Sequence, residues 1–292
     1  MTFCKWIEKN TKDLSGKTVA LTGSTGGLGI ELCDLLARLG ARLVFLDRNY
    51  DKSLAHAKKL LNKYGTNVLC IKTDLSDFAS VRSATVRLAE IKPDVFIHNA
   101  GAYDIPRYKT DIGYDNVFQI NFISPYYMIT HLLPVFREKQ TRVVAVSSIA
   151  HNYSKIDETD VDFSTRSKSS KVYGNAKRFL TFALFSLFER EKDTTLSIVH
   201  PGISFTGITN HYPKLIFAII KYPMKIIFEK PRKACLSIVR GVFEKTDTCE
   251  WIGPRVFGVW GLPCKSSLKT ASFKEREKID EIARGIVLGL DA

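Results

Sequence analysis

The fold of this 292-residue chain is decided by Thr22-Gly23-Ser24-Thr25-Gly26-Gly27-Leu28-Gly29. An uninterrupted apolar run, Lys17–Thr22, leads into this stretch, and Gly27–Leu39 has the apolar spacing of a helix. A strand, a glycine-rich turn and a helix in this order allow a diphosphate to meet free N–H groups at the helix N-terminus. A purely structural turn is the alternative. The strand and helix around it favour a dinucleotide-binding loop built from Gly23, Ser24, Thr25, Gly27, Leu28 and Gly29.

The same alternation continues along the chain. Further strands are predicted at Arg42–Asp47, Asn67–Thr73, Asp94–His98, Arg142–Ser147 and Leu196–His200, and further helices over Leu54–Tyr64, Asp77–Ile91, Tyr114–Lys139 and Tyr173–Glu191. Strands without polar alternation are buried on both faces, as in a parallel sheet covered by helices. A helix over Pro231–Phe243 and a strand near Arg255–Val259 would complete about seven strands. We therefore predict one α/β domain over residues 1–292, a Rossmann-type doubly wound parallel sheet with helices on both faces.

Three segments extend this domain. Residues 1–13 form an N-terminal extension, and residues 272–292 form a C-terminal tail with the pattern of a surface helix. Residues 203–233, after the sixth strand, are a long apolar and basic insertion that we expect to cover the substrate as a lid. Long insertions after a sheet strand are more often functional than idle.

Composition narrows the class of protein. Lys and Arg exceed Asp and Glu by 43 − 30, which gives a net charge of +13 and favours anionic ligands. The six cysteines are scattered without a C-x-x-C pair, which disfavours a metal site and a disulfide framework and suits a reducing compartment. No apolar run is long enough for a spanning helix or a secretory signal, so we expect a cytoplasmic protein. No recognition helix or arginine-rich stretch supports nucleic-acid binding.

Asp47 ends the second predicted strand, 18 residues beyond Gly29. A carboxylate at this place accepts hydrogen bonds from the adenosine ribose and repels a 2′-phosphate, so Asp47 favours NAD. Arg48 follows directly and could stack on the adenine or hold that phosphate, which keeps NADP as the alternative.

Further motifs follow the glycine loop in a fixed order: Asp74-Leu75, Asn99-Ala100-Gly101, Asn121, Ser148, Tyr173-x-x-x-Lys177 and Pro201-Gly202. Together with Thr22–Gly29 they resemble the short-chain dehydrogenase/reductase family over roughly Leu14–Thr206. The resemblance implies an enzyme that acts on a CH–OH group with NAD or NADP, often as a homo-oligomer. It also implies cofactor contacts from positions that follow strands three, four and six. These are Asp74, Leu75, Asn99, Ala100, Gly101, Pro201, Gly202, Ile203 and Thr206.

The catalytic residues are also assigned by this resemblance: Asn121, Ser148, Tyr173 and Lys177. Tyr173 and Lys177 are four residues apart and share a helix face, so we expect the ammonium to lower the pKa of the phenol and make it an acid–base catalyst. The resemblance implies that Lys177 also holds the nicotinamide ribose. It implies that Ser148, in preference to Ser147, binds the substrate oxygen and that Asn121 anchors a water.

Ser148 and Tyr173 are 25 residues apart, about twice the common family spacing. The additional segment Ile149–Val172, together with Asp111–Asn121 and His200–Gly202, resembles the retinol-dehydrogenase-like and WW-domain-oxidoreductase-like branch. Several members of that branch use NADP.

The apolar insertion indicates a bulky apolar alcohol or ketone, such as a hydroxysteroid, bile acid or retinoid. Between Asn210 and Lys233 it holds six Lys or Arg residues and one acid, so it could guide an acidic substrate or rest on a membrane surface. The competing interpretation of the whole chain is a catalytically silent nucleotide-sensing scaffold. The presence of Ser148, Tyr173 and Lys177 together argues against it.

Overall fold

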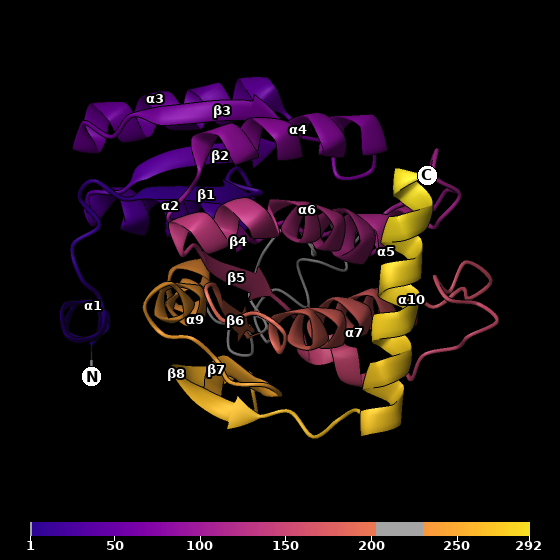
Figure 1. The fold of residues 1–292 in the computed structure, drawn as a ribbon. Coiled ribbons are helices and arrows are strands. Elements are labelled where there is room, and N and C mark those ends of the chain that lie inside the picture. The colour runs from indigo at the N-terminus through magenta and orange to yellow at the C-terminus, as the bar shows by residue number, and fades with distance from the viewer. Residues whose placement is uncertain (1, 203–229) are drawn as a thin grey trace, which may run out of the picture.

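The computed structural model describes residues 2–202 and 230–292. Within them, one sheet has the strand order β3-β2-β1-β4-β5-β6-β7-β8 (Figure 1). Strands β1 to β7 are parallel to their neighbours, and β8 is antiparallel to β7. The strands are β1 (Thr18–Thr22), β2 (Arg42–Asp47), β3 (Val68–Lys72), β4 (Val95–His98), β5 (Arg142–Val146), β6 (Thr195–Val199), β7 (Glu250–Val256) and β8 (Trp260–Ser267).

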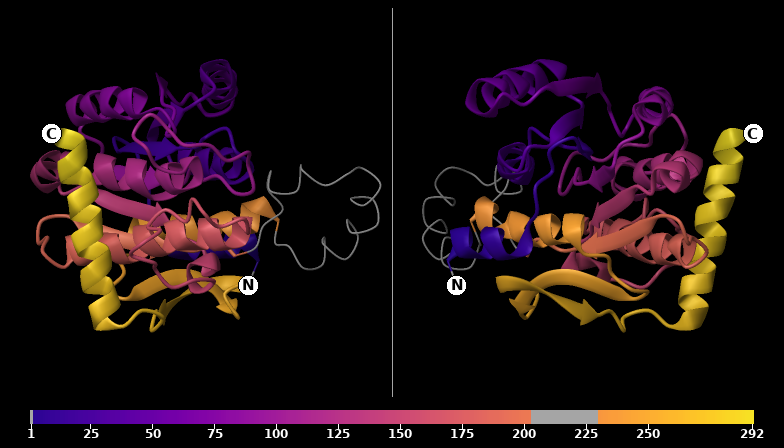
Figure 2. Two further views of the ribbon diagram at one scale, coloured as in Figure 1. Left: turned by 90° about the vertical axis from the view of Figure 1, so that its right-hand side faces the viewer. Right: turned by 60° about the vertical axis from the view of Figure 1, so that its left-hand side comes forward.

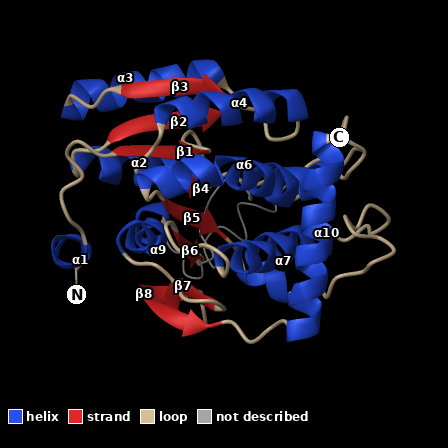
Figure 3. Cartoon of the chain, viewed as in Figure 1, coloured by secondary structure: helices blue, strands red, loops and turns tan. Residues whose placement is uncertain are grey.

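Helices cover both faces of the sheet (Figure 3). One face carries α1 (Phe3–Asn10), α2 (Gly27–Arg38), α3 (Tyr50–Tyr64) and α9 (Pro231–Phe243). The other carries α4 (Phe78–Ile91), α6 (Ser124–Lys139) and α7 (Ser169–Phe188), with α10 (Phe273–Asp291) packed on their outer side. Each face has its own apolar core, and the strand residues Val19, Ala20 and Leu21 between the cores are fully buried. The doubly wound Rossmann-type prediction is confirmed.

Strand order reverses between β1 and β4, so the chain segments that leave these two strands diverge. In open α/β sheets, ligands bind outside the carboxyl ends of the strands at this reversal. The segments that follow β1, β4 and β5 are therefore the ones that position the candidate site. Two short elements belong to them: α5 (Asn116–Phe118) with the π-helix Gln119–Ile123, and the 3₁₀ turn η2 (Ile149–Asn152).

The structure differs from the sequence-based expectation at two elements. Helix α7 begins at Ser169 instead of Tyr173, because its first turn is polar and the apolar spacing starts only at Val172. The strand expected near Arg255–Val259 is a hairpin: β7 ends at Val256, and Phe257 and Gly258 take φ values of 51° and 67° before β8 starts. The sheet therefore has one strand more than the expected seven, and this additional strand, β8, is antiparallel to β7.

The N-terminal extension is also ordered, since Trp6 and Ile7 of α1 are buried against the core shared by α2 and α9. Helices α1 and α10 lie on opposite sides of the molecule (Figure 2). None of the helices within residues 2–202 and 230–292 combines the length and the apolar character needed to cross a bilayer.

Candidate active site

The glycine loop after β1 is packed so closely that side chains would not fit. Gly23 has a φ of +73°, and a Cβ built on it would lie 3.0 Å from the Cα of Ala100. A Cβ on Gly29 would lie 2.0 Å from the carbonyl oxygen of Gly23. Helix α2 therefore starts directly against the loop and leaves its first N–H groups at the loop surface, the arrangement that suits a diphosphate.

Asn99 joins this loop to the end of β4. Its Nδ2 donates to the carbonyl oxygens of Thr22 and Gly23, both at 3.1 Å. The Thr22 hydroxyl accepts from the backbone N–H groups of Asn99 and Ala100 at 3.1 and 3.0 Å. Asn99 Oδ1 is buried without a hydrogen-bond partner among the described residues. A buried acceptor left open beside a glycine loop fits a polar group of a bound nucleotide.

Asp47 lies at the end of β2 and is only 3% exposed. Its Oδ2 accepts from Ser53 Oγ at 2.8 Å and from Ser24 Oγ. The carboxylate thus also ties the glycine loop, through Ser24, to β2, a contact the sequence did not reveal. Arg48 is exposed to solvent.

Asn121 lies in the π-helix Gln119–Ile123. Its Nδ2 donates to the carbonyl oxygens of Ala102 and Val117 at 2.8 Å each, and its Oδ1 accepts from the N–H of Ala102 at 3.3 Å. A Cβ on Gly101 would lie 2.8 Å from Asn121 Oδ1 and 3.5 Å from Lys177 Nζ. The predicted residues Gly101, Asn121 and Lys177 are therefore neighbours, and π-helical turns are frequent at functional sites.

Ser148, Tyr173 and Lys177 come together as expected. A side-chain hydrogen bond joins Ser148 to Tyr173. Lys177 Nζ lies 5.7 Å from the centre of the Tyr173 ring and donates to the carbonyl oxygen of Val146 at 2.9 Å. Ser147 is buried and shares a hydrogen bond of 2.6 Å with Thr181, so it faces away from Tyr173. The geometry supports the choice of Ser148.

The electrostatics of this pair differ from the sequence-based expectation. Burial raises the pKa of Tyr173 to about 12, although the hydrogen bond with Ser148 acts to lower it. Burial also lowers the pKa of Lys177 to about 7. Loss of water disfavours both the tyrosinate and the ammonium, so the expected lowering of the phenol pKa by Lys177 is wrong for the chain alone.

Other predicted cofactor residues have varied surroundings. The Asp74 carboxylate accepts from the N–H and the hydroxyl of Ser76 at 2.9 and 2.7 Å, and Leu75 is buried. Pro201 is buried, and Gly202 takes a φ of +81°, where a Cβ would lie 2.8 Å from the carbonyl oxygen of Val259. Ile203, Thr206 and the lid up to residue 229 lie outside the described residues.

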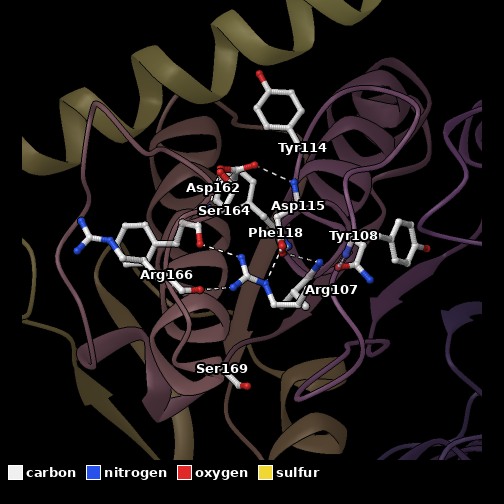
Figure 4. Close-up of polar contacts among 12 residues, drawn as sticks. Arg107, Tyr108, Tyr114, Asp115, Phe118, Asp162, Ser164, Arg166 and Ser169 are labelled. Atoms are coloured by element: carbon white, nitrogen blue, oxygen red, sulfur yellow. Dashed lines mark hydrogen bonds and ion pairs between the residues drawn. The ribbon is translucent and has the colours of Figure 1, made fainter.

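Figure 4 shows an arginine contact that the sequence analysis missed. Arg107 Nε donates to Asp115 Oδ2 at 2.8 Å, and its two terminal nitrogens donate to the carbonyl oxygens of Phe163 and Arg166. The N–H of Asp115 in turn donates to Asp162 Oδ2 at 2.7 Å. Arg107 thereby fastens the segment after β4 to the long Ser148–Tyr173 segment.

The same two segments carry two more tyrosines near Tyr173. Tyr103 meets the Tyr173 ring edge to face, with ring centres 5.3 Å apart. Tyr153 follows η2, and both Tyr103 and Tyr153 act to raise the pKa of Tyr173. These rings could have been suspected only from their positions after Gly101 and Ser148.

Comparison with known proteins identifies the family. A model of the short chain dehydrogenase family matches residues 17–159. Retinol dehydrogenase 12 of Bos taurus is 34% identical over 217 residues, which cover 72% of this chain and 68% of the relative. The chain belongs to the short-chain dehydrogenase family. The same enzyme of Mus musculus is 35% identical over 206 residues, 68% of this chain but only 65% of the length of that relative.

More distant relatives agree with this assignment. A WW domain-containing oxidoreductase of Drosophila melanogaster is 27% identical over 226 residues, 72% of this chain and 55% of the relative. A crystal structure of a putative uncharacterized protein from Mycobacterium paratuberculosis has a TM-score of 0.74 at 23% identity and covers 96% of both chains, which shows the shared fold. The expected resemblance to the retinol-dehydrogenase-like branch of this family is confirmed.

We predict that Arg107→Met lowers the free energy of unfolding by about 2 kcal/mol, because it leaves the buried Asp115 carboxylate without its charged donor. Hydrogen exchange should also become faster over residues 157–168. Denaturant titration and exchange mass spectrometry measure the two effects.

The matched control is Glu138→Gln, which breaks an exposed ion pair with Lys92 and should cost less than about 1 kcal/mol. Equal stability of Arg107→Met and the wild type would contradict the assigned role of Arg107.

Proposed function

We propose that this chain is an NAD(P)-dependent oxidoreductase that interconverts an alcohol and its ketone or aldehyde on a bulky apolar substrate. The observation that carries the proposal is the hydrogen-bonded pair of Ser148 and Tyr173 beside Lys177, at the carboxyl edge where the glycine loop lies. Family membership supports the reaction class.

A bound nicotinamide cofactor would supply or accept the hydride. Tyr173 would exchange the proton with the substrate oxygen, and Ser148 would donate a hydrogen bond to that oxygen as negative charge develops on it. With its pKa raised to about 12, the Tyr173 phenol holds its proton at neutral pH and acts as a donor in carbonyl reduction. Alcohol oxidation requires the tyrosinate, which needs added positive charge nearby.

The residues that would hold the cofactor are those around the glycine loop. Loop N–H groups would bind the diphosphate, Asp47 the adenosine ribose, and Lys177 the nicotinamide ribose. Asp47 supports NAD over NADP, because its carboxylate, held at the end of β2 by hydrogen bonds from Ser24 and Ser53, lies where a 2′-phosphate would be placed.

The proposed substrate class rests on aromatic side chains near Tyr173. The Tyr103 ring packs edge to face on Tyr173, and Tyr153 lies near enough to raise its pKa; the two tyrosines come from the two segments that Arg107 holds together. Aromatic side chains beside the reacting phenol favour a flat apolar alcohol or ketone over a sugar. The names of the mammalian relatives, retinol dehydrogenases, agree with this class.

We predict that Tyr173→Phe lowers kcat by about 10³-fold and leaves the dissociation constant of the cofactor unchanged, because only the proton donor is lost. A panel of hydroxysteroids, retinoids and simple alcohols, assayed with both cofactors in both directions, measures turnover. Near wild-type turnover in Tyr173→Phe would remove the phenol from the mechanism.

We predict a higher kcat/KM with NADH than with NADPH, and Asp47→Ala should shift this preference toward NADPH by removing the charge that repels a 2′-phosphate. Ser53→Ala is the control, since it removes one hydrogen bond to Asp47 and keeps the charge. A wild type that prefers NADPH would overturn the cofactor assignment.

A further prediction concerns the pH dependence of NADH binding. Because the pKa of Lys177 in the free protein is about 7, its side chain loses its charge above that pH. NADH affinity should therefore fall about fivefold between pH 6.5 and pH 8.5, since a neutral amine forms the weaker hydrogen bond. Fluorescence titration measures it, and Lys177→Met should bind NADH with no such pH dependence. The same pH dependence in Lys177→Met would assign it to another group.

A further inference from the structure

The Ser148 segment is held by residues far from the proposed reaction. Ser148 Oγ accepts from the N–H of Ala150 at 3.2 Å, so the orientation of this hydroxyl depends on the position of the turn η2. The backbone carbonyl of Ser148 accepts from the N–H of His151 at 3.0 Å and is 2.7 Å from His151 Nδ1. His151 is fully buried within η2.

The two ring nitrogens of His151 have distinct roles. A carbonyl oxygen only accepts, so the ring proton is on Nδ1 and is donated to Ser148. His151 Nε2 is then the acceptor, and it lies 3.1 Å from the hydroxyl of Thr270. Thr270 lies between β8 and α10. The imidazole therefore links the backbone of Ser148 to the C-terminal part of the chain.

Arg178 makes a second link between the same parts. It is on α7, is 2% exposed, and its Nη1 donates to the carbonyl oxygen of His151 at 3.0 Å. Its Nε and Nη2 hold the Glu275 carboxylate at 2.8 and 2.7 Å, and Nη2 also donates to the carbonyl oxygen of Thr270 at 2.7 Å. Glu275 belongs to the first turn of α10, which Ser272 caps.

Ring packing surrounds the link. The His151 ring meets Trp251 of β7 edge to face at 5.4 Å, and Trp251 stacks on His200 at 5.0 Å. His200 directly precedes Pro201 and Gly202. The turn η2 therefore has polar contacts to Thr270 and Arg178 and an apolar contact to β7, and none of these groups touches Tyr173 in the described structure.

We infer that His151 is a positioning residue for Ser148. Thr270 and the Arg178–Glu275 pair anchor η2 to the segment that runs from Thr270 to the start of α10, so this segment supports the hydroxyl that is proposed to bind the substrate. The inference rests on the proposed function of Ser148. The role of these residues is to keep Ser148 Oγ in place against Tyr173, and displacements of about 1 Å at reacting groups can cost about a hundredfold in rate.

The test uses the full-length protein with its cofactor. His151→Phe keeps the ring against Trp251 but removes the donor to Ser148, so kcat should fall about tenfold or more while cofactor affinity stays within about twofold. His151→Asn places an amide donor near the position of Nδ1 and should recover most of this loss. Thr270→Val removes only the donor to Nε2 and should lower kcat by a smaller factor.

Glu189→Gln is the matched control. It removes an exposed ion pair of 3.2 Å with Arg276, which also joins α10 to the end of α7 but lies away from η2. This variant should keep the wild-type kcat. A loss equal to that of Thr270→Val would show that general loosening of α10 is responsible, and would overturn the specific link through Thr270.

Hydrogen exchange over residues 147–153 gives a readout that needs no turnover. Exchange should be faster in His151→Phe and Thr270→Val than in the wild type and Glu189→Gln. A wild type inactive on every substrate would refute the proposed function while exchange still tests the support of this segment. Unchanged exchange in both variants would overturn the inference. If His151→Phe does not fold, exchange in Thr270→Val alone decides: faster exchange than in the wild type supports the inference, and unchanged exchange overturns it.

Discussion

The arrangement of the candidate site depends on how closely helix α7 approaches the segment that carries Ser148. A Cβ built on Gly174 would lie 2.4 Å from the carbonyl oxygen of Ala150, so only glycine allows this distance. One turn further, Lys177 Nζ donates to the carbonyl oxygen of Val146. Helix α7 thus contacts the Ser148 segment on both sides of the serine, and Tyr173, next to Gly174, meets Ser148 as a result.

This close packing explains the charges of the pair. A helix that approaches a strand end so tightly excludes water, and loss of water disfavours the charged forms of both Tyr173 and Lys177. The chain alone therefore holds a neutral phenol and a lysine that titrates near neutral pH. Groups with strongly shifted pKa values are common at functional sites, because catalysis needs pKa values that match the reaction. The rest of the fold offsets the stability that such groups cost.

The sequence was informative where the signal is local. Apolar runs predicted the parallel strands correctly, and the glycine loop and Asp47 could be proposed as a nucleotide site, because each of these signals depends on neighbours within about twenty residues. The supports of the site were not predictable. His151 and Thr270 are 119 residues apart, and Arg107 and Phe163 are 56 apart, so no periodicity connects them. The direction of the pKa shift of Tyr173 was also predicted wrongly. The four-residue spacing indicates that Tyr173 is close to Lys177, but it does not indicate the burial, which outweighs the effect of the ammonium.

The distance along the chain between Arg178 and Glu275 has a consequence during synthesis. The glycine loop, Asp47 and Asn99 all lie within the first hundred residues, and the strands β1, β2 and β4 that carry them can pair while translation continues. Thr270 and Glu275 leave the ribosome about a hundred residues after Tyr173, so η2 has no C-terminal anchor during that interval. A nascent chain can acquire the half proposed to bind the nucleotide long before it acquires an ordered Ser148.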